Sequence, residues 1–479
     1  MSSQSTKPAR GMRDFLPADV RRRTYVIDVV REVYERYGFE PLETPAVENL
    51  ETLMGKYGEE GNQLIFPILK RGEQFTSSLE QVKQGAASGA AKDLADLALR
   101  YDLTVPLARV MAEYRAQLPK FFKRYQIQPV WRADRPARGR FREFYQCDVD
   151  ICGSKSLIVE AEMCAAVSDV LTTLGFTNFA IRLNHRQLLA AIIDVAGVPA
   201  DRTGDALVAL DKLDKIGREG VLKDMTARQI DEAAANRLLG LFAGEGDGSS
   251  ADGPVPVDAA SNGATLEKLA AFVGDHPVGK AALDDLRTIL AYAQPTGAHG
   301  RLAIDPSLAR GLSYYTGAIV EVAVSDLAGS LGGGGRYDNL VGMFSNQSVP
   351  AAGFSLGLER IIVVMTERGM FPPSLDADAA PAEVMVTVWN AEKIGDALAL
   401  ARDLRAAELP GGRKLRVDVY PEADKIGKQF KYAGDRKIPY VVVAGDDELA
   451  QGTVTIKNMR TGEQKTVRRE EAVTALLES

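Results

Sequence analysis

The stretch FFKRYQIQPVWRADRPARGRFREFYQCDVDIC, residues 121–152, decides the fold, because it reads as two β-strands joined by a basic turn. On the return strand, apolar or aromatic side chains alternate with polar ones: Tyr145, Cys147, Val149 and Ile151 against Gln146, Asp148 and Asp150. The outgoing strand alternates in the same way, with Tyr125, Ile127 and Trp131 opposite Gln126, Gln128 and Arg132. A period of two with one apolar and one polar face predicts half-buried strands.

The connection between these strands is the segment DRPARGR, in which Pro136 and Gly139 predict a turn or loop rather than a helix. From Lys120 to Arg142 there are eight basic side chains and one acidic side chain, Asp134. Planar guanidinium groups suit phosphate and carboxylate oxygens. The segment is therefore either a solvated charged hairpin or an anion-binding site, and the rest of the chain favours the second interpretation.

The composition bounds the class of protein. A chain of 479 residues is long enough for roughly three domains of ~150 residues each, and its 46% hydrophobic and 26% charged residues are typical of globular proteins. The net charge of −7 argues against a general nucleic-acid coat protein but leaves room for a local basic site. Three cysteines without a CxxC pair and three scattered histidines predict neither a disulfide framework nor a metal site.

No targeting or membrane-spanning segment is evident in the sequence. The N-terminal stretch MSSQSTKPARGMRDF lacks the apolar core of a signal peptide, and no apolar run is long enough to cross a bilayer. We therefore expect a cytoplasmic protein without a membrane partner.

The N-terminal part of the chain predicts alternating helices and extended segments. A helix is expected over roughly 19–37, followed by an extended segment that contains Pro41 and Pro45 and runs into a short helix. A strand ending near Thr104 precedes a helix with Pro106 in its first turn. A helix over about 155–173 and a strand over 179–184 follow the hairpin.

The remaining sequence changes texture twice. Residues 186–298 are mainly helical in pattern, and glycine-rich strand patterns return after 302. The Pro/Ala/Asp-rich segment 371–382 predicts a linker. Beyond it, three short β-rich runs alternate with helical patterns, which predicts a small α/β domain with parallel strands.

Three separated segments together resemble the motifs of class II aminoacyl-tRNA synthetases. They are GFEPLETPAVE at 38–48, the hairpin with its arginines, and GFSLGLERI at 353–361. RYDLTVPLAR at 100–109, ARGLSYYTG at 309–317 and GGGGRYDNLVGMF at 332–344 further resemble the histidyl-tRNA synthetase family. The resemblance spans nearly the whole chain, including DKLDK at 211–215, and it rests on several motifs in order.

The resemblance implies an α+β fold with the antiparallel catalytic sheet of class II synthetases. It divides the chain into a first catalytic part (1–185), a helical insertion (186–298), a second catalytic part (299–372), a linker (373–382) and an α/β anticodon-binding domain (383–479). Motif 1 of this class builds a twofold interface, so Pro45 and its neighbours imply a homodimer.

The implied activity is that of a histidine–tRNA ligase. Such an enzyme joins L-histidine to ATP as an adenylate, with Mg²⁺ present, and transfers the acyl group to the terminal adenosine of tRNA(His). The alternative is the catalytically silent paralogue that regulates histidine biosynthesis. That paralogue usually lacks the C-terminal domain and the ATP-binding arginines, both of which this chain keeps.

The family's motifs assign site residues by position. Arg132 and Arg310 are implied to act at the reacting carboxylate and α-phosphate, and ATP is implied to contact Arg132, Asp134, Arg140 and Arg360, with Arg142 a weaker candidate. Histidine is implied to lie against Asp102, Thr104, Gln146, Asp150, Tyr315 and Tyr337. Strand alternation independently places Gln146 and Asp150 on one polar face. No metal ligand is assigned in the protein.

Several further expectations depend on local pattern. Tyr314 and Tyr315 would point to opposite sides of a strand, and the glycines at 332–335 form either a turn or a close approach of the backbone to substrate. Ser313 stands where the family commonly has Asp, which implies an altered contact to Tyr315. Lys425, Lys428 and Arg436 lie in a basic segment that is either a solvated face or a tRNA contact.

Overall fold

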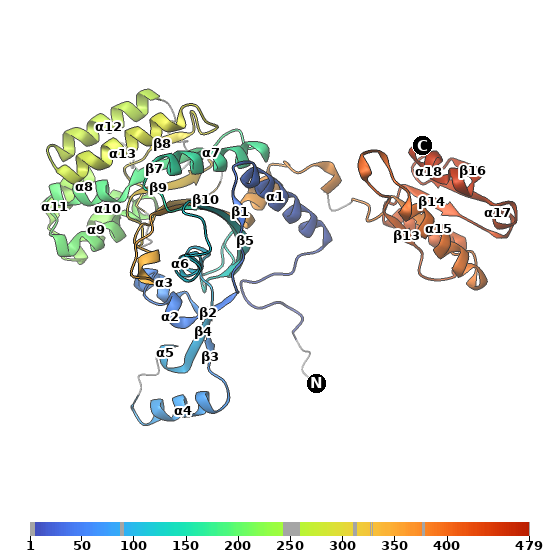
Figure 1. Ribbon diagram of the computed structural model, residues 1–479, viewed down its shortest axis with the longest axis horizontal. Helices are drawn as coiled ribbons and strands as arrows, with labels where there is room; N and C mark the ends of the chain where they lie inside the picture. The colour runs from blue at the N-terminus through green and yellow to red at the C-terminus, as the bar shows by residue number, and fades with distance from the viewer. Residues whose placement is uncertain are drawn as a thin grey trace. The chain divides into compact units, whose positions relative to one another are not determined.

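The computed structural model describes residues 5–86, 91–242, 259–309, 314–325, 327, 329–375 and 379–478; the side chains of residues 59, 60, 91, 214, 215 and 259 are excluded. The chain divides into two compact units. The first contains residues 22–370 and the segment before Phe15, and the second contains residues 15–21 and 371–479. Figure 1 shows both units and the labels of their helices and strands.

The first unit is built on an eight-stranded sheet. Its strands are, in spatial order, β1 (Glu40–Pro41), β5 (Phe122–Trp131), β6 (Glu143–Cys152), β11 (Ala351–Gly357), β10 (Ser330–Arg336), β9 (Ala318–Ala323), β7 (Ala180–His185) and β8 (Leu302–Ile304). The outer pairs β1–β5 and β7–β8 are parallel, and all inner pairs are antiparallel. The expected hairpin, β5–β6, lies in this sheet beside β11.

Three helices connect to the hairpin side of this sheet: α1 (Pro17–Arg36), α7 (Ile158–Thr173) and α14 (Leu358–Glu367). Helix α1 buries Val26, Val30 and Val33, the spacing of one helical face. An ion pair of 2.6 Å joins Arg23 of α1 to Glu359 of α14, and the same carboxylate accepts a bond of 2.9 Å from the Tyr145 amide of β6. These contacts fix both helices against the hairpin.

A smaller antiparallel sheet precedes the hairpin in sequence. It contains β2 (Val47–Asn49), β4 (Ala95–Leu99) and β3 (Phe66–Leu69), with the short helices α2 (Leu50–Leu53), α3 (Gly58–Gln63), α4 (Gly72–Lys83) and α5 (Ala91–Leu94). The strand expected to end near Thr104 ends at Leu99, and α6 (Thr104–Glu113) begins after the turn at 100–103. The sequence did not predict α4, which buries only Ser78 and so lacks a clear apolar stripe.

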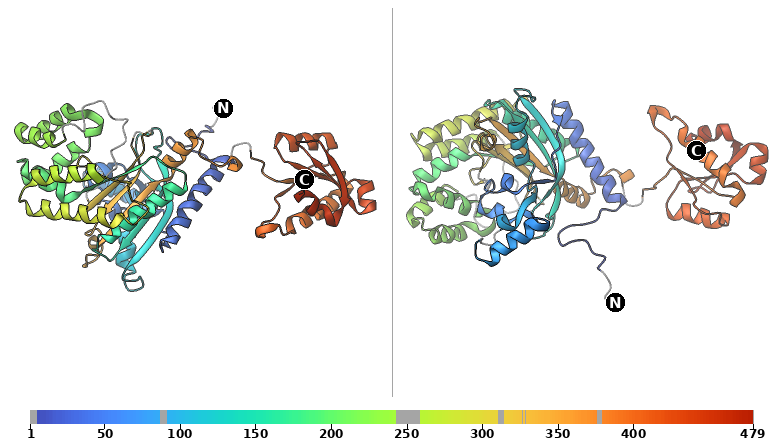
Figure 2. Two further views of the ribbon diagram at one scale, coloured as in Figure 1. Left: turned by 90° about the horizontal axis from the view of Figure 1, so that it is seen from above. Right: turned by 60° about the horizontal axis from the view of Figure 1, so that its bottom comes forward.

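The described residues between 186 and 298 (186–242 and 259–298) are mainly helical, as the pattern indicated. They are α8 (Arg186–Val195), α9 (Thr203–Leu210), α10 (Leu213–Ala227), α11 (Glu232–Leu241), α12 (Ala259–Val273) and α13 (Pro277–Ala293), with the 3₁₀ turn η1 (Ala200–Arg202). These green-to-yellow helices gather together beyond β7 and β8 in both Figure 1 and Figure 2. Asn262 of α12 bonds the backbone of Leu302 and Ile304, which attaches the helices to β8.

The second unit contains a five-stranded sheet in the order β13 (Val417–Val419), β12 (Val384–Val386), β14 (Tyr440–Val443), β15 (Thr453–Asn458) and β16 (Gln464–Arg468). Its helices are α15 (Ile394–Ala406), α16 (Ile426–Asp435), α17 (Asp446–Gln451) and α18 (Ala472–Leu477). The expected parallel pairing holds for β13, β12 and β14, but β14–β15 and β15–β16 are antiparallel. Strand β16 was not predicted because its residues are mostly exposed and polar.

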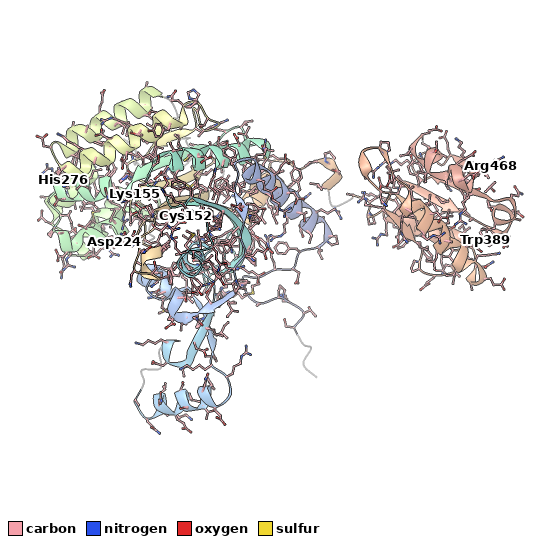
Figure 3. The ribbon with its side chains drawn as sticks, viewed as in Figure 1. Cys152, Lys155, Asp224, His276, Trp389 and Arg468 are labelled. Atoms are coloured by element: carbon pink, nitrogen blue, oxygen red, sulfur yellow. The ribbon has the colours of Figure 1, made fainter. Side chains whose placement is uncertain are left out.

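Two further features concern the state of the cysteines and the hydropathy of the helices. Cys147, Cys152 and Cys164 are free and buried, and Figure 3 labels Cys152 among the side chains of the first unit. Within the part of the chain that the structure describes, no helix is long and apolar enough to cross a membrane.

Candidate active site

The hairpin β5–β6 is buried more deeply than its alternating pattern predicts. From Gln146 to Cys152 every residue of β6 is buried, on the polar face as well as the apolar one. The Tyr34 hydroxyl of α1 lies over the apolar side and donates to the Cys147 carbonyl at 3.4 Å. On the polar side, Arg124 reaches the Leu103 carbonyl before α6 at 3.2 Å. The prediction of half-buried strands is therefore wrong for β6, because both of its faces are covered.

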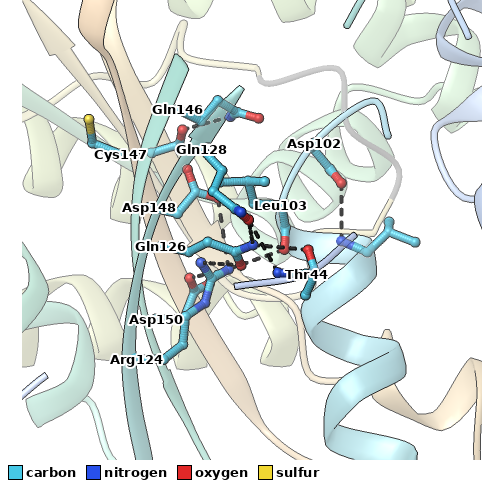
Figure 4. A network of polar contacts seen from close by, with 12 residues as sticks. Thr44, Asp102, Leu103, Arg124, Gln126, Gln128, Gln146, Cys147, Asp148 and Asp150 are labelled. Carbon is cyan, nitrogen blue, oxygen red and sulfur yellow. Dashed lines mark hydrogen bonds and ion pairs between the residues drawn. The ribbon is translucent and has the colours of Figure 1, made fainter. Parts of the chain in front are cut away.

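The polar face of the hairpin holds a buried acidic cluster. Asp150 pairs with Arg124, which lies opposite it on β5, with 2.8 Å between Oδ2 and Nη2. The Tyr337 hydroxyl donates a short bond to the other oxygen of Asp150. Asp148 Oδ2 lies 3.8 Å from the same guanidinium nitrogen, and Gln146 donates to Ser355 at 2.6 Å. Figure 4 shows these polar side chains of the hairpin directed to one side, toward the segment that leads into α6.

Burial controls the protonation of this cluster. Burial raises the pKa of Asp150, and it raises the pKa of Asp148 to about 7, because a carboxylate removed from water loses its solvation. Burial alone would lower the pKa of Arg124, but the carboxylates of Asp150 and Asp148 raise it above its ordinary value. The pKa of the Tyr337 hydroxyl is raised by burial and by Asp150, so this group remains a hydrogen-bond donor.

A series of side-chain hydrogen bonds fixes the guanidinium of Arg124. Its Nη1 donates to Gln126 at 3.2 Å, and Gln126 donates in turn to Thr44 at 2.9 Å and to Gln128 at 2.6 Å. Arg100, which is 1% exposed, donates to Gln128 at 3.0 Å and to the Thr44 carbonyl at 2.6 Å. Two buried arginines thus tie the acidic cluster to the segment that contains Pro45.

Asp102 forms a second acidic position at the entrance to α6. It is 2% exposed, and its Oδ1 accepts bonds from the Tyr57 hydroxyl at 2.9 Å and from the Val105 amide at 3.1 Å. The Tyr314 hydroxyl lies 3.4 Å from Oδ2. Burial raises the pKa of Asp102, while the Val105 amide and the positive charge of Arg132 oppose that shift.

Arg132 follows directly after β5 and is positioned by backbone and rings. Its Nε donates to the Tyr101 carbonyl at 3.1 Å, and its guanidinium carbon lies 4.3 Å from the Tyr101 ring centre and 5.2 Å from that of Phe144. Cation–π contacts of this kind hold a guanidinium without neutralising its charge. Arg132 is therefore fixed in place while it keeps its positive charge.

Of the other basic residues of the turn, Arg135, Arg138 and Arg140 are exposed, and Arg142 is half-buried. Arg142 donates to the Asp134 carbonyl at 3.2 Å, and Arg140 is exposed beside a one-residue bridge to Ala137. Arg360 lies in the first turn of α14 and bonds the Ser330 carbonyl. A Cβ added at Gly139 would lie 3.4 Å from Cγ of Arg360, so the basic turn lies over this arginine.

The glycine run lies inside a strand. Residues 332–335 belong to β10 in the middle of the sheet, so the interpretation as a turn is wrong. A Cβ at Gly334 would collide with the Gly353 carbonyl of β11, and a Cβ at Gly353 would collide with the Asp150 carboxylate. The glycines allow close strand packing, and Gly353 leaves the space that Asp150 occupies.

Tyr314 and Tyr315 lie before β9 rather than in a strand, so the expectation that they point to opposite sides of a strand is wrong. Both are buried, and their ring centres are 5.0 Å apart in an edge-on arrangement. The ring centre of Tyr314 also lies 6.1 Å from that of Tyr337. Arg310 and Ser313, which the sequence analysis singled out, lie outside the described residues.

The structure therefore brings together most of the expected residues around one face of the sheet. Those at the buried end are Asp102, Thr104, Gln146, Asp150, Tyr315 and Tyr337, and Arg132 and Arg360 lie toward the basic turn. Pro45 is exposed, and its carbonyl accepts from Arg100. In the second unit, Lys425, Lys428 and Arg436 are exposed on or beside α16.

Three residues in this arrangement, Asp148, Arg124 and Tyr57, were not predicted as site residues from the sequence. Asp148 shares the polar face with Gln146 and Asp150, so alternation could have identified it. Arg124 was counted only among basic side chains, and its burial depends on pairing with two acids that follow it on the other strand. Tyr57 carries no pattern that would connect it to Asp102, which lies in a different element.

Comparisons with known proteins cover nearly the whole chain. A sequence profile described as histidyl-tRNA synthetase matches residues 11–361, and a profile described as anticodon binding domain matches residues 383–479. The chain is 42% identical to a histidine–tRNA ligase of Porphyromonas gingivalis over 95% of each chain. It is also similar to a crystal structure of histidyl-tRNA synthetase from Nostoc sp. PCC 7120, with a TM-score of 0.74, 29% identity and coverage of 99% of this chain and 100% of that one.

A third comparison concerns the regulatory alternative. A Bacillus halodurans structure described as an ATP phosphoribosyltransferase regulatory subunit/histidyl-tRNA synthetase has a TM-score of 0.69 at 20% identity, covering 92% of this chain and 99% of that one. At this identity the likeness shows the fold alone. The regulatory paralogue is not favoured, because the Porphyromonas gingivalis relative matched over 95% of this chain is named a ligase.

An antiparallel sheet flanked by helices, followed by a separate α/β unit, is the fold of a class II aminoacyl-tRNA synthetase with a C-terminal anticodon-binding domain. The expected fold class is confirmed. Within that class, the match over residues 11–361 is specific. The chain belongs to the histidyl-tRNA synthetase family.

Proposed function

We propose that the chain activates L-histidine with ATP to histidyl-adenylate and diphosphate, and then transfers histidine to the 3′-terminal adenosine of tRNA(His). The observation that carries this proposal is the single polar face of the hairpin, with buried acids at one end and the accessible cation of Arg132 at the other. An amino acid presents an ammonium and a carboxylate, and ATP presents phosphates. The buried acids at one end suit the ammonium of the amino acid. The cation of Arg132 at the other end suits the carboxylate and the phosphates of ATP.

Adenylate formation needs orientation and charge stabilisation more than a base. A carboxylate oxygen of histidine attacks the α-phosphorus, and the bond to the bridging oxygen breaks, so that diphosphate leaves with the electron pair. The attacking carboxylate is already ionised at neutral pH, since α-carboxyl groups have pKa values of about 3.5. Arg132 would stabilise the negative charge that builds on the α-phosphate, with Arg310 as a second cation at the carboxylate.

The outer parts of ATP would lie against the basic turn. Arg360 would pack on the adenine and reach the outer phosphates, while Asp134 and Arg140 would contact the nucleotide. Among the described residues, no group of three or more His, Cys, Asp or Glu side chains could hold a metal ion. We propose that Mg²⁺ enters the site with ATP, whose phosphates supply most of its protein-independent ligands.

Histidine would bind at the acidic end. Asp102, Thr104 and Gln146 would receive the α-ammonium, and Asp150, Tyr315 and Tyr337 would surround the imidazole. Tyr337 already donates to Asp150, which leaves that carboxylate fixed for a ring N–H. A site of this kind rejects other amino acids, because a wrong ligand leaves buried polar groups without partners.

The proposal extends to partners and domain roles. The helical segment 186–298 would contact the acceptor stem, and the domain from 383 would bind the anticodon through exposed bases near Lys425, Lys428 and Arg436. Pro45, exposed beside the small sheet, would lie in a homodimer interface. A cytoplasmic location, where tRNA is charged, belongs to the same proposal.

Exchange of labelled pyrophosphate into ATP tests the activity. We expect exchange with magnesium and histidine and none with each of the other amino acids as the single substrate. Exchange without amino acid dependence, or no exchange from folded protein, would contradict the proposal. A regulator that uses the same fold would bind histidine or tRNA without supporting exchange.

A further inference from the structure

Three buried carboxylates face the proposed amino-acid site, and two of them already have partners for both oxygens. Asp102 accepts from Tyr57 and Val105 through Oδ1 and faces the Tyr314 hydroxyl through Oδ2. Asp150 accepts from Tyr337 through Oδ1, and its Oδ2, which has no hydrogen-bond partner among the described residues, forms a close ion pair with Arg124 at 2.8 Å. Each oxygen of these two acids therefore already faces a donor or a cation of the protein, and a ligand would share these oxygens with those groups.

Asp148 differs from both. It is 2% exposed, and among the described residues its Oδ1 has no hydrogen-bond partner. Its Oδ2 lies 3.8 Å from Arg124, a full ångström farther than Asp150 at 2.8 Å. On the strand it lies between Gln146 and Asp150, and so between the positions proposed for the ammonium and for the imidazole (Figure 4).

The charges around Asp148 do not balance. The groups that face it are Arg124 from β5, Asp150 from β6, the Ser355 hydroxyl from β11, whose hydrogen bond to the carboxylate lowers its pKa, Asp102 from the turn before α6, Arg100 just after β4 and Tyr34 from α1. One fully buried guanidinium thus serves two carboxylates of the same strand. A buried carboxylate without full compensation is costly unless it binds a proton or a cation.

We propose that Asp148, held in place by Arg124, is a further substrate-binding residue of the amino-acid site, and that its Oδ1 accepts a hydrogen bond from the α-ammonium of the bound amino acid. The ammonium, rather than the imidazole, would balance the negative charge of the cluster, because it carries a full positive charge at neutral pH. This inference rests on the proposed function, since it assumes that an amino acid binds at this face.

Binding of the ammonium beside Asp148 would change the number of protons that this carboxylate holds. Without a bound amino acid, a substantial fraction of Asp148 is protonated near neutral pH, because burial raises its pKa to about 7. An ammonium beside it favours the charged form and lowers that pKa, so that ligand binding releases a proton. A ligand without the ammonium does not release it.

The experiment measures binding of two ligands, L-histidine and its deaminated analogue imidazolepropionate, by calorimetry. The proteins are wild type, Asp148→Asn, and the control Asp305→Asn, in which another buried aspartate of the first unit loses its charge beside Arg182. We expect Asp148→Asn to weaken histidine binding by roughly 10- to 100-fold and to leave the analogue unchanged. The control should keep the wild-type ratio of the two affinities.

Equal losses for both ligands, or no loss for histidine, would overturn the inference, since a merely structural role weakens both alike. If Asp148→Asn does not fold, the wild type alone decides: in buffers of different ionisation heat near pH 7, histidine should release more protons than the analogue after the protons lost or gained by each ligand's own imidazole, known from its titration, are subtracted. Equal proton exchange would overturn the inference. Pyrophosphate exchange by the wild type separates the two proposals, because exchange without the Asp148 effect contradicts this inference alone.

Discussion

The two ends of the hairpin β5–β6 differ in the sign of the charge that they present. At the turn, arginines are at least partly exposed, and Arg132 is positioned by the rings of Tyr101 and Phe144 rather than by an acid. At the buried end, Asp148 and Asp150 share one ion-pairing guanidinium, that of Arg124, and glycines let neighbouring strands pack closely around them. One end keeps a cation ready for phosphate, and the other keeps negative charge ready for an amino acid.

The largest expected effect comes from removing the cation at the turn. Arg132→Ala should lower kcat for pyrophosphate exchange by roughly 10²- to 10³-fold, since a positioned charge that meets developing negative charge is lost. Equilibrium binding of histidine should be unchanged. The matched control is Arg138→Ala, an exposed arginine of the same turn paired with Glu367, which should keep its activity. Equal losses in both variants would show that general positive charge, not position, matters.

The next effect tests the buried end. Arg124→Met should lower the free energy of unfolding by about 3–5 kcal/mol, because it leaves Asp148 and Asp150 buried without their cation. Urea denaturation at pH 7 measures the change. Arg31→Met, which removes an exposed pair with Asp28, should cost about 0–1 kcal/mol. A loss at Arg124 no greater than at Arg31 would refute the role of Arg124 in balancing the acids.

A pH-dependent effect sharpens the same contrast. An unfolded aspartate releases its proton near pH 3.9, whereas burial raises the pKa of folded Asp148 to about 7. Between these values the folded state binds more protons, so this group makes stability fall as pH rises. Asp148→Asn should therefore gain stability relative to wild type from about pH 4 to pH 7, measured by urea denaturation at several pH values. A constant difference would contradict the raised pKa.

The smallest effect lies outside the hairpin. Lys428→Ala removes an exposed cation of α16 whose partner is Asp424. It should reduce the salt dependence of tRNA binding by about one unit of slope and leave pyrophosphate exchange unchanged. Filter binding over a range of salt concentrations gives the slope. An unchanged slope would assign this lysine to a solvated face.

Sequence reasoning predicted the hairpin and its polar face because strand alternation is local. It could not predict that the face is buried, because the cover comes from the segment at 102–103 and from Tyr337, far along the chain. The same limit hides the packing of β10, whose glycines reflect its strand neighbours. It also hides the contact from Tyr57 to Asp102.

The buried charge of Arg124 was out of reach for a related reason. A lysine- and arginine-rich segment usually lies in solvent, and nothing in residues 120–142 separates Arg124 from its neighbours. Its partners follow the turn, and only the register that pairs Arg124 with Asp150 brings them together. Strand β16 was missed because polar, exposed residues give no apolar period.

The most direct test of the division between the two ends is equilibrium binding of histidine and of ATP to wild type and Asp150→Asn. The account predicts that Asp150→Asn weakens histidine binding by at least roughly 10-fold, since one charged partner of a buried contact is lost, while ATP binds as it does to wild type. Histidine binding equal to wild type would contradict the acidic end as the amino-acid site. Parallel losses of both substrates would contradict the separation itself.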